Sequence, residues 1–381
     1  MVRKGHPDWE SIYSRAFVVD SHADSILDVV PSTIPLMFEY LQQYFHEEGE
    51  TKHVDSLLDA TVGYILDKSG ATVTAGKVDT NPSAGVRSLV QKSSVGHLDF
   101  PRMIEAGIGL EFLSVYTEHE YKYERAARRA LVLINEILNQ VEGFGKLRII
   151  LNKEDLRRSV RNHEPSILIS FEGGEPFEGE IGLVKAFYRL GVRCVGLTYN
   201  ERNQIGDGHA ESRTKSGLTE FGTRVVAEMN KLGMLIDVAH MSEHTFYDVL
   251  DHTKKPIINS HACCYAIKRH TRNMTDDQLR ALADNRGVVG ILFAGAGLLT
   301  DAPTATMDDI VRHVAHAVEI AGVSHVGLGS DFDGTRKLPR GLRDVRDTRK
   351  IAEALLKHGF SEKETRMILG ENTVDLLMNV L

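Results

Sequence analysis

Short apolar or β-branched runs alternate with helical segments along most of this chain, and this alternation restricts the fold more than any other feature. Strand followed by helix, repeated, implies parallel strands joined by right-handed crossovers. Eight such units predict an α/β fold, a closed (β/α)8 TIM-type barrel; a doubly wound open sheet is the alternative, because a sequence does not show closure. The eight runs occupy residues 17–21, 108–115, 166–171, 192–198, 235–239, 256–259, 288–293 and 325–328.

Helix signals support the repeat. Thr275 with Gln278, and Ser361 with Glu364, have the spacing of capping boxes at helix starts. After the last strand, further helices are expected, so that the whole chain, residues 1–381, is predicted to form one barrel domain with extra C-terminal helices. The predicted helices cover residues 123–140, 182–190, 220–232, 243–251, 276–284 and 307–321, and after the barrel residues 343–358, 362–369 and 372–381.

One long segment after the first strand does not fit the repeat. It covers residues 31 to about 101, with a helical piece near residues 36–45 and a polar stretch over residues 72–94. Connections of this length usually carry function or structure of their own. We expect a helical insertion over the top of the barrel, and a surface loop is the alternative.

The composition is that of a globular chain and disfavours several classes of partner. Of 381 residues, 42% are hydrophobic and 26% charged, which is ordinary for a protein with a sizeable core. A net charge of -8 without a long basic tract disfavours nucleic acid and anionic membranes. No apolar run approaches the ~20 residues of a spanning helix, and the N-terminus lacks the apolar core of a signal peptide. Three cysteines form no disulfide framework, so a cytoplasmic location is expected.

Ionisable side chains stand at the ends of five of the eight predicted strands. In a parallel barrel these ends meet at one mouth, where active sites are built. Each residue taken alone is as easily a helix cap, a turn residue or a core histidine, and only the joint pattern indicates a site. The side chains are His22 and Asp24, Glu172, His240, His261, and Asp331 with Asp333.

So many ionisable groups buried at one mouth need a compensating charge, which a divalent metal ion supplies. Three imidazoles with two or three carboxylates form a mixed nitrogen and oxygen set that suits zinc and tolerates manganese or cobalt. The set is too large for one tetrahedral ion, and a carboxylate such as Glu172 can bridge two. The pattern therefore predicts a hydrolytic site with two metal ions about 3.5–4 Å apart.

At these residues the chain resembles the membrane (renal) dipeptidase family, the M19 metallopeptidases of the amidohydrolase superfamily. The resemblance extends over residues 17–378 outside the insertion and rests on residues 20–24, 171–174, 237–242, 260–261, 272–274 and 329–334. It implies two Zn²⁺ ions per chain, bridged by Glu172. His22 and Asp24 would hold one ion, and His240 and His261 the other.

The resemblance also implies an activity, that of a zinc-dependent dipeptidase that cleaves the peptide bond of dipeptides through a metal-bridging hydroxide. Glu172 and Asp331 would be the catalytic carboxylates, with Asp331 handling the proton of the bridging water. Arg272 would bind the carboxylate of the substrate. The expected partners are a dipeptide or similar small amide and, in a homodimer, a second copy of the chain.

The chain departs from the family's mammalian members at Tyr199. Counting from Glu172, this position holds a histidine in those members, where it is thought to stabilise the tetrahedral oxyanion. A phenol donates a hydrogen bond but carries no positive charge, so oxyanion stabilisation is expected to be weaker or to come from elsewhere. Two alternatives stay open: a sister amidohydrolase acting on another small amide or lactone, such as an N-acyl amino acid or a β-lactam, and a non-catalytic metal-binding barrel.

Overall fold

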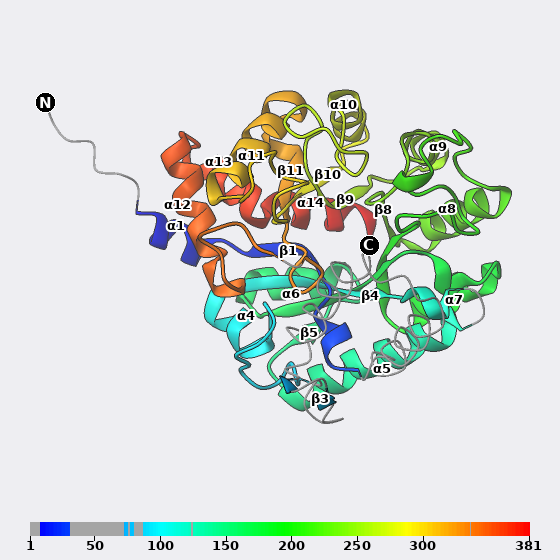
Figure 1. The fold of residues 1–381 in the computed structure, drawn as a ribbon, viewed down its shortest axis with the longest axis horizontal. Coiled ribbons are helices and arrows are strands. Elements are labelled where there is room, and N and C mark those ends of the chain that lie inside the picture. Colours follow the sequence, from blue (N-terminus) through cyan, green and yellow to red (C-terminus); the bar gives the residue numbers. More distant parts are fainter. Residues whose placement is uncertain (1–7, 31–71, 75–76, 80–86, 123–124, 336) are drawn as a thin grey trace, which may run out of the picture.

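The computed structural model describes residues 8–30, 72–74, 77–79, 87–122, 125–335 and 337–381. In this part of the chain, eight parallel strands form a barrel with helices around its outside (Figure 1). Each predicted apolar run corresponds to one of them. In chain order the strands are β1 (Val18–Ala23), β4 (Ile108–Tyr116), β6 (Ser166–Glu172), β7 (Val192–Gly196), β8 (Leu235–Asp237), β9 (Ile258–Ala262), β10 (Val288–Leu292) and β11 (Val326–Gly329).

The barrel closes through strands β1 and β4. Strand β4 pairs with β6 in a register that runs from Leu110 opposite Ser166 to Tyr116 opposite Glu172. On its other side β4 pairs with β1, and β1 pairs with β11. The ring of strands is therefore complete, which confirms the predicted (β/α)8 barrel and excludes the open sheet.

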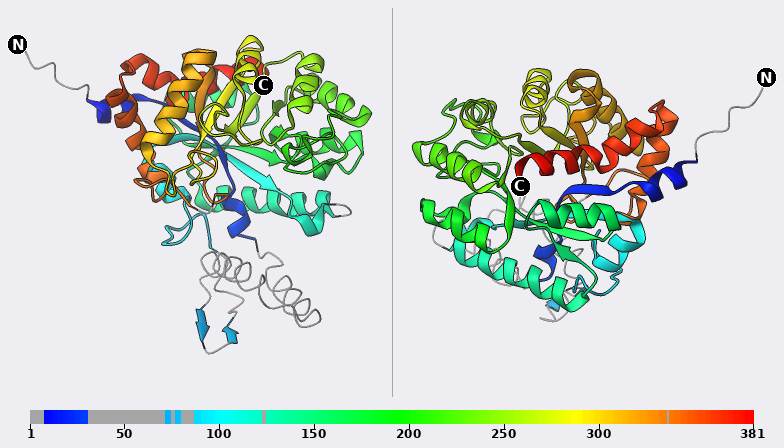
Figure 2. Two further views of the ribbon diagram at one scale, coloured as in Figure 1. Left: turned by 45° about the horizontal axis from the view of Figure 1, so that its top comes forward. Right: turned by 180° about the vertical axis from the view of Figure 1, so that it is seen from behind.

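Helices that follow the strands cover the outer surface of the barrel, as the two views in Figure 2 show. Both predicted capping boxes are present, at Thr275 and at Ser361. Of the helices described, none combines the length and apolarity needed to cross a membrane. The helices between the strands are α5 (Ala126–Phe144), α7 (Ile181–Arg189), α8 (Glu220–Leu232), α9 (Glu243–His252), α10 (Asp276–Asp284) and α11 (Met307–Ala321).

The interior of the barrel is a packed apolar core, distinct from the larger core between strands and helices. One residue or more from most strands contributes to it, including Val19, Phe112 and Leu168. The helix α14 (Asn372–Val380) adds Leu376 and Leu377 to the same cluster, so it covers the end of the barrel where the strands begin. The opposite end, where the strands finish, stays available for a site.

The C-terminal helices differ from the prediction at one boundary. The helix α12 spans Arg349–His358, α13 spans Glu362–Arg366, and a π-helical turn over Met367–Glu371 leads into α14. Residues 343–348 were expected to be helical but form a loop with a short turn at Val345–Asp347. Asp344 has extended backbone there, and its side chain accepts a hydrogen bond from the backbone of Arg346, which competes with helix formation.

Four short elements are absent from the sequence prediction: α1 (Trp9–Arg15), α4 (Phe100–Ala106), β5 (Arg148–Ile149) and α6 (Lys153–Asn162). In α6 only Leu156 and Ser159 are buried, so the apolar periodicity that reveals a helix is missing. The strand β5 has two residues and pairs with the first two residues of β6. Because β5 pairs with β6 alone, it does not become a ninth strand of the closed barrel.

The insertion predicted at residues 31–101 is described in part. The helical piece expected at residues 36–45 lies outside the described residues. Two short strands, β2 (Thr72–Thr74) and β3 (Lys77–Asp79), pair antiparallel within the polar stretch at residues 72–94, for which no secondary structure is predicted. β-branched residues at Thr72, Val73, Thr74 and Val78 favour a strand.

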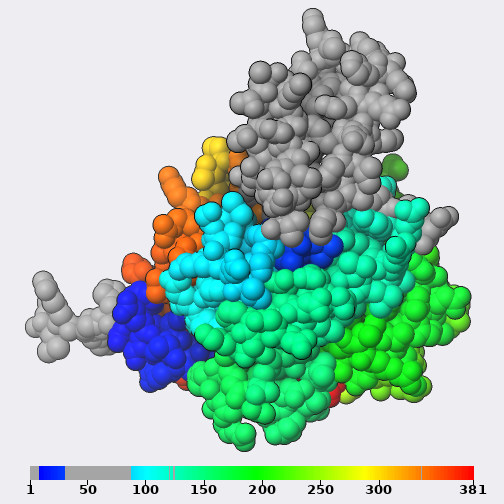
Figure 3. Space-filling view, turned by 90° about the horizontal axis from the view of Figure 1, so that it is seen from below, coloured from blue at the N-terminus to red at the C-terminus, as the bar shows by residue number. Residues whose placement is uncertain are grey.

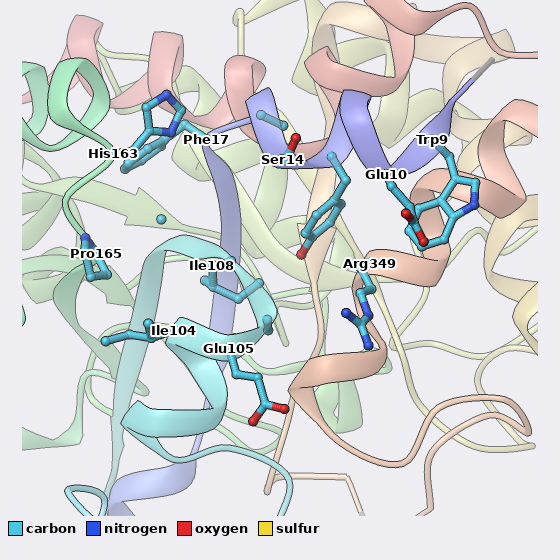
Figure 4. Close-up of a pocket in the computed structure, with 15 residues that line it drawn as sticks. Trp9, Glu10, Ser14, Phe17, Ile104, Glu105, Ile108, His163, Pro165 and Arg349 are labelled. Atoms are coloured by element: carbon cyan, nitrogen blue, oxygen red, sulfur yellow. The ribbon is translucent and has the colours of Figure 1, made fainter.

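A cavity of about 500 Å³ opens between α1, α4 and the first residues of β4. Figure 3 shows the blue N-terminal segment, which includes α1, beside the cyan segment, which includes α4. Figure 4 shows Trp9, Phe17 and Ile108 around it, with His163 at one edge and Arg349 at another. The cavity lies near the starts of β1 and β4, at the end of the barrel remote from the ionisable strand ends. Among the described residues, no group of three metal-ligating side chains lines it.

Candidate metal centre

The predicted ligands come together at the end of the barrel where the strands finish. His22 lies near the end of β1 and His261 near the end of β9, and Glu172 ends β6. Asp24, His240 and Asp331 follow the ends of their strands within three residues. All of them except His22 line a cavity of about 510 Å³ together with Tyr199 and Arg272, and His22 lies against Glu172 beside it. Along the described chain, the structure thus places every sequence-predicted site residue in one cluster: His22, Asp24, Glu172, Tyr199, His240, His261, Arg272 and Asp331.

One carboxylate oxygen forms the centre of this cluster. Oε1 of Glu172 lies 3.0 Å from Nε2 of His240, 3.5 Å from Nε2 of His261 and 3.6 Å from Nε2 of His22. Three imidazoles therefore present the same nitrogen to one oxygen. This arrangement is that of a carboxylate positioned to share metal ions with the histidines around it.

His22 also belongs to a second group of ligand atoms. Its Nε2 lies 3.6 Å from Oδ2 of Asp24 and 3.9 Å from Oδ1 of Asp331. In each group, one with Glu172 and His261 and one with Asp24 and Asp331, the ligand atoms lie within 4.8 Å of one another. Both groups contain His22, so they lie side by side at the mouth of the barrel.

Orphaned polar atoms show that the cluster fits metal ions. Nε2 of His22 and Oδ1 of Asp24 are buried, and neither has a hydrogen-bond partner among the described residues. Nε2 of His240 lies 2.9 Å from Nε2 of His261, a close approach of two nitrogens that a shared cation stabilises. Buried polar groups without partners are costly, so a ligand is needed to satisfy them.

The protonation states of the clustered side chains also fit a metal site. Burial lowers the pKa of His240 and His261 well below the ordinary value, so both imidazoles are neutral and can bind metal. Burial, together with the neighbouring Asp24 carboxylate, raises the pKa of Glu172 and of Asp331. Burial opposes the charged form of His22, but the carboxylates of Asp24, Glu172 and Asp331 raise its pKa to about 10. The proton that His22 then holds offsets part of the negative charge of these carboxylates, and a divalent ion at this position would take its place.

The backbone at two strand ends is strained. His240 has a φ of 63° and Asp331 a φ of 61°, both in the left-handed region that side chains other than glycine rarely adopt. Such conformations cost on the order of 1–3 kcal/mol and concentrate at functional sites. Close packing also restricts Gly334, because a Cβ there would lie 2.1 Å from Oδ1 of Asp331 and 2.2 Å from Oδ2 of Asp24.

Asp333, which follows the same strand as Asp331, has a different role from the metal-facing carboxylates. Its side chain accepts hydrogen bonds from Ser25, from the guanidinium of Arg87 and from the backbone N–H groups of His97 and Leu98. It therefore anchors the end of the insertion to the mouth of the barrel. No metal-ligand group among the described residues includes it.

Arg272 lies in the cavity wall with part of its guanidinium unsatisfied. Its Nη2 donates a hydrogen bond to the backbone oxygen of His261 at 2.7 Å. Its Nη1 is buried and has no hydrogen-bond partner in the described part of the chain. A buried guanidinium with a free donor is suited to bind an anionic group.

Tyr199 lies between the metal cluster and a buried lysine. Its ring stacks on His240, contacts the ring of Tyr116 with 4.6 Å between centroids, and lies 5.1 Å from Nζ of Lys122. Burial and the carboxylate of Glu172 raise the pKa of the Tyr199 phenol above its ordinary value. The phenol therefore keeps its proton and acts as a hydrogen-bond donor.

Two residues of the cavity were missed by sequence reasoning. The side chain of Asn200 accepts hydrogen bonds from the rings of both His240 and His209. Burial, with Arg272 and His270 nearby, lowers the pKa of His209 to about 4, so its ring is neutral near pH 7. Asn200 follows the predicted strand at residues 192–198 by two residues, but an amide is not a typical metal ligand. His209 stands at no strand end, and the high histidine count, 17 in 381 residues, is its only sequence signal.

Comparisons with known proteins agree with this geometry. The family model described as membrane dipeptidase (peptidase family M19) matches residues 65–380. A dipeptidase of Claviceps purpurea, tcpJ, is 32% identical over 299 residues, covering 76% of this chain and 70% of that protein. The crystal structure of dipeptidase AC, a metallopeptidase of family M19, is similar with a TM-score of 0.75 and 25% identity, covering 96% of this chain and 99% of that one.

A metallopeptidase of Rhodobacter sphaeroides, solved with a phosphinate mimic of the dipeptide L-Ala-D-Ala, has the same fold. Its TM-score is 0.74 at 24% identity, over 96% of this chain and 99% of that one. The family model matches far more than half of the chain, the Claviceps purpurea relative is named a dipeptidase, and dipeptidase AC is described as a member of family M19. The chain is a metallopeptidase of the membrane dipeptidase family, M19, within the amidohydrolase fold.

Proposed function

We propose that this protein is a zinc-dependent dipeptidase with two zinc ions bridged by Glu172. One observation carries the proposal: the cavity lined by Glu172, His240 and His261 is also lined by Arg272, whose buried Nη1 has no hydrogen-bond partner among the described residues. A metal centre beside a single free cation suits a small substrate that has a scissile amide and a nearby carboxylate. A dipeptide has both groups a few bonds apart.

Each residue has a role that follows from its position. Bound zinc would act as a Lewis acid on the scissile carbonyl and would lower the pKa of water towards neutrality. Asp331 would take a proton from the attacking water and return it to the leaving amine. Arg272 would bind the substrate carboxylate through its unpaired Nη1, and the Tyr199 phenol would donate a hydrogen bond to the developing oxyanion.

The test is an assay of the zinc-loaded protein against free dipeptides, N-acyl amino acids and a β-lactam. The panel includes L-Ala-D-Ala, because the Rhodobacter sphaeroides neighbour was solved with a mimic of it. We expect the highest kcat/KM for a dipeptide, and loss of activity on chelation that zinc restores. Faster turnover of an N-acyl amino acid or β-lactam would identify a sister amidohydrolase. Metal binding without turnover of any member would identify a non-catalytic barrel.

The bridging role of Glu172 is tested by metal analysis. The wild type is expected to hold two divalent ions per chain after loading with zinc and removal of excess metal. Glu172→Gln should reduce occupancy of both sites, because the amide cannot bridge two cations as a carboxylate does. The exposed Glu180, in the same loop, provides the control Glu180→Gln, which should keep both ions. One ion or none in the wild type would contradict the binuclear site.

A further inference from the structure

We infer that Asn200 is a positioning residue that fixes the tautomer of the metal ligand His240, and that His209 and Thr271 hold its side chain in place. The inference rests on the metal site proposed above. Oδ1 of Asn200 lies 2.7 Å from Nδ1 of His240 and 2.9 Å from Nε2 of His209. Nδ1 of His209 lies 2.9 Å from Oγ1 of Thr271.

The direction of each hydrogen bond follows from the carbonyl oxygen of Asn200. This oxygen only accepts, so Nδ1 of His240 and Nε2 of His209 must both carry hydrogen. In a neutral His240 ring, Nε2 then keeps its lone pair, and this is the nitrogen that lies 3.0 Å from Oε1 of Glu172. Likewise Nδ1 of His209 becomes an acceptor for the hydroxyl of Thr271. Each hydrogen bond in the series from His240 through Asn200 and His209 to Thr271 then has one donor and one acceptor.

The opposite orientation of the Asn200 amide is incompatible with a metal at His240. Its NH2 group would then face both rings, and Nδ1 of His240 would have to accept. The hydrogen of a neutral His240 would move to Nε2, the atom turned towards Glu172 and His261. A protonated nitrogen cannot bind a metal ion, so only the carbonyl orientation supports the ligand role.

A second predicted ligand, His261, is oriented by a comparable set of hydrogen bonds, made by different residues. Nδ1 of His261 lies 2.8 Å from Oγ of Ser260, and this hydroxyl donates to Oδ2 of Asp237 at 2.6 Å. The hydroxyl hydrogen is thus used by Asp237, so Oγ accepts from His261. The orienting group of His261 is its neighbour in sequence, whereas that of His240 comes from the loop after β7.

The loop after β7 is shaped to bring Asn200 to His240. The backbone N–H of His209 donates to the backbone oxygen of His240 at 2.7 Å, and that of Ala210 donates to the backbone oxygen of Asn200 at 2.9 Å. At Gly208 a Cβ would lie 2.1 Å from the backbone oxygen of Tyr199, so glycine is required for this close approach. Side chain and backbone of the loop therefore both bind His240, whose left-handed conformation needs such support.

Two measurements test the inference, and neither depends on turnover. The first is NMR of isotope-labelled histidine rings in the zinc-loaded wild type, with His209→Gln to assign its signal. We expect His240 to carry hydrogen on Nδ1 and to bind metal through Nε2, and His209 to carry hydrogen on Nε2. Hydrogen on Nδ1 of His209, or metal on Nδ1 of His240, would overturn the inference.

The second measurement is zinc affinity by competition with a chelator. Asn200→Leu removes the acceptor and should weaken binding of at least one ion by about 10- to 100-fold. Asn200→Asp keeps an acceptor and should remain closer to the wild type. Asn230→Leu, which replaces a half-buried amide on α8 far from the cavity, controls for the substitution itself and should leave affinity unchanged.

Unchanged zinc affinity in Asn200→Leu would refute the positioning role. If Asn200→Leu fails to fold, the NMR measurement on the wild type still shows which nitrogens of His240 and His209 carry hydrogen. The dipeptidase proposal is tested by a different measurement, the turnover of the substrate panel. Metal affinity and ring tautomers would stay as expected in a metal-binding barrel of any activity.

Discussion

The ring of Tyr199 lies stacked on the imidazole of His240, with 4.5 Å between centroids and 27° between planes. The phenol is thereby held against a metal ligand, on the edge of the cavity that also contains Arg272. A histidine at this position could place positive charge on an oxyanion, whereas the phenol offers only a hydrogen bond. Lys122, which lies over the rings of both Tyr199 and Tyr116, brings a buried cation near this edge.

Tyr199→Phe keeps the stacked ring and removes the hydroxyl. If this hydroxyl donates to the oxyanion, kcat for a good dipeptide should fall by about 10²-fold, with a smaller change in KM. Steady-state kinetics check this, with Tyr116→Phe as the matched phenol. A greater loss of kcat in Tyr116→Phe than in Tyr199→Phe would assign the donor to Tyr116.

Asp331→Asn should separate proton transfer from metal binding. The amide cannot accept the proton of water, so turnover should fall by roughly 10²–10⁴-fold. Both metal ions should remain, because the Glu172 group of ligands is unchanged. Parallel metal analysis and kinetics provide the measurement: near wild-type turnover would remove Asp331 from the mechanism, and loss of an ion would make it a ligand.

Arg272 should make the enzyme sensitive to the charge at the C-terminus of its substrate. Amidation of a good dipeptide leaves the buried guanidinium without its anion, a loss on the order of 2–5 kcal/mol, so kcat/KM should fall at least about 30-fold. Arg272→Met should shrink this discrimination, and the two effects should be non-additive because they concern one interaction. Arg269→Met changes an exposed arginine of the same segment and should preserve the discrimination. Equal turnover of free and amidated dipeptide by the wild type would refute the carboxylate clamp.

Glu111 on β4 should make stability depend on pH. Both of its carboxyl oxygens are buried without a hydrogen-bond partner among the described residues. Burial, followed by the charges of Asp20 and Asp333, raises the pKa of Glu111 well above its ordinary value of 4.5. The unfolded chain then releases this proton at lower pH than the folded chain, so the contribution of Glu111 to stability falls as pH rises above 4.5.

Glu111→Gln removes this titratable group, so the free energy of unfolding should decline less steeply as the pH rises. The difference in unfolding free energy between variant and wild type should grow with pH, by up to about 1.4 kcal/mol per pH unit. Denaturant unfolding of the zinc-loaded proteins between pH 5 and 8 measures it. Glu142→Gln, at an exposed position on α5, should run parallel to the wild type. A parallel course for Glu111→Gln as well would mean that Glu111 is ionised in the folded protein.

The barrel could be predicted because its strands are buried on both faces. Runs such as residues 166–171 and 288–293 are largely apolar and buried throughout, and they stand out between amphipathic helices. The helix α6 could not be found in this way, because charged residues fill most of its positions and it buries little. The loop at residues 343–348 was mistaken for helix because propensity does not register the side-chain hydrogen bond of Asp344.

The ligand cluster could be predicted because a parallel barrel brings all strand ends to one mouth. His22, Glu172 and His261 needed no knowledge of loop structure to be grouped. Asn200 and His209 could not be found in this way, since their contact depends on how residues 200–209 fold back over His240. The glycine at position 208 is the local signal of that turn, but it does not say which side chains meet.

The position of α14 has a consequence for how the chain is made. Leu376, Leu377 and Val380 complete the same apolar cluster as Phe17 and Leu235, although α14 follows all eight strands in the sequence. A ribosome synthesises the chain from its N-terminus, so the barrel interior stays uncapped until α14 has emerged. Translation that stops early would leave a nascent barrel with its apolar interior open to water and to other chains.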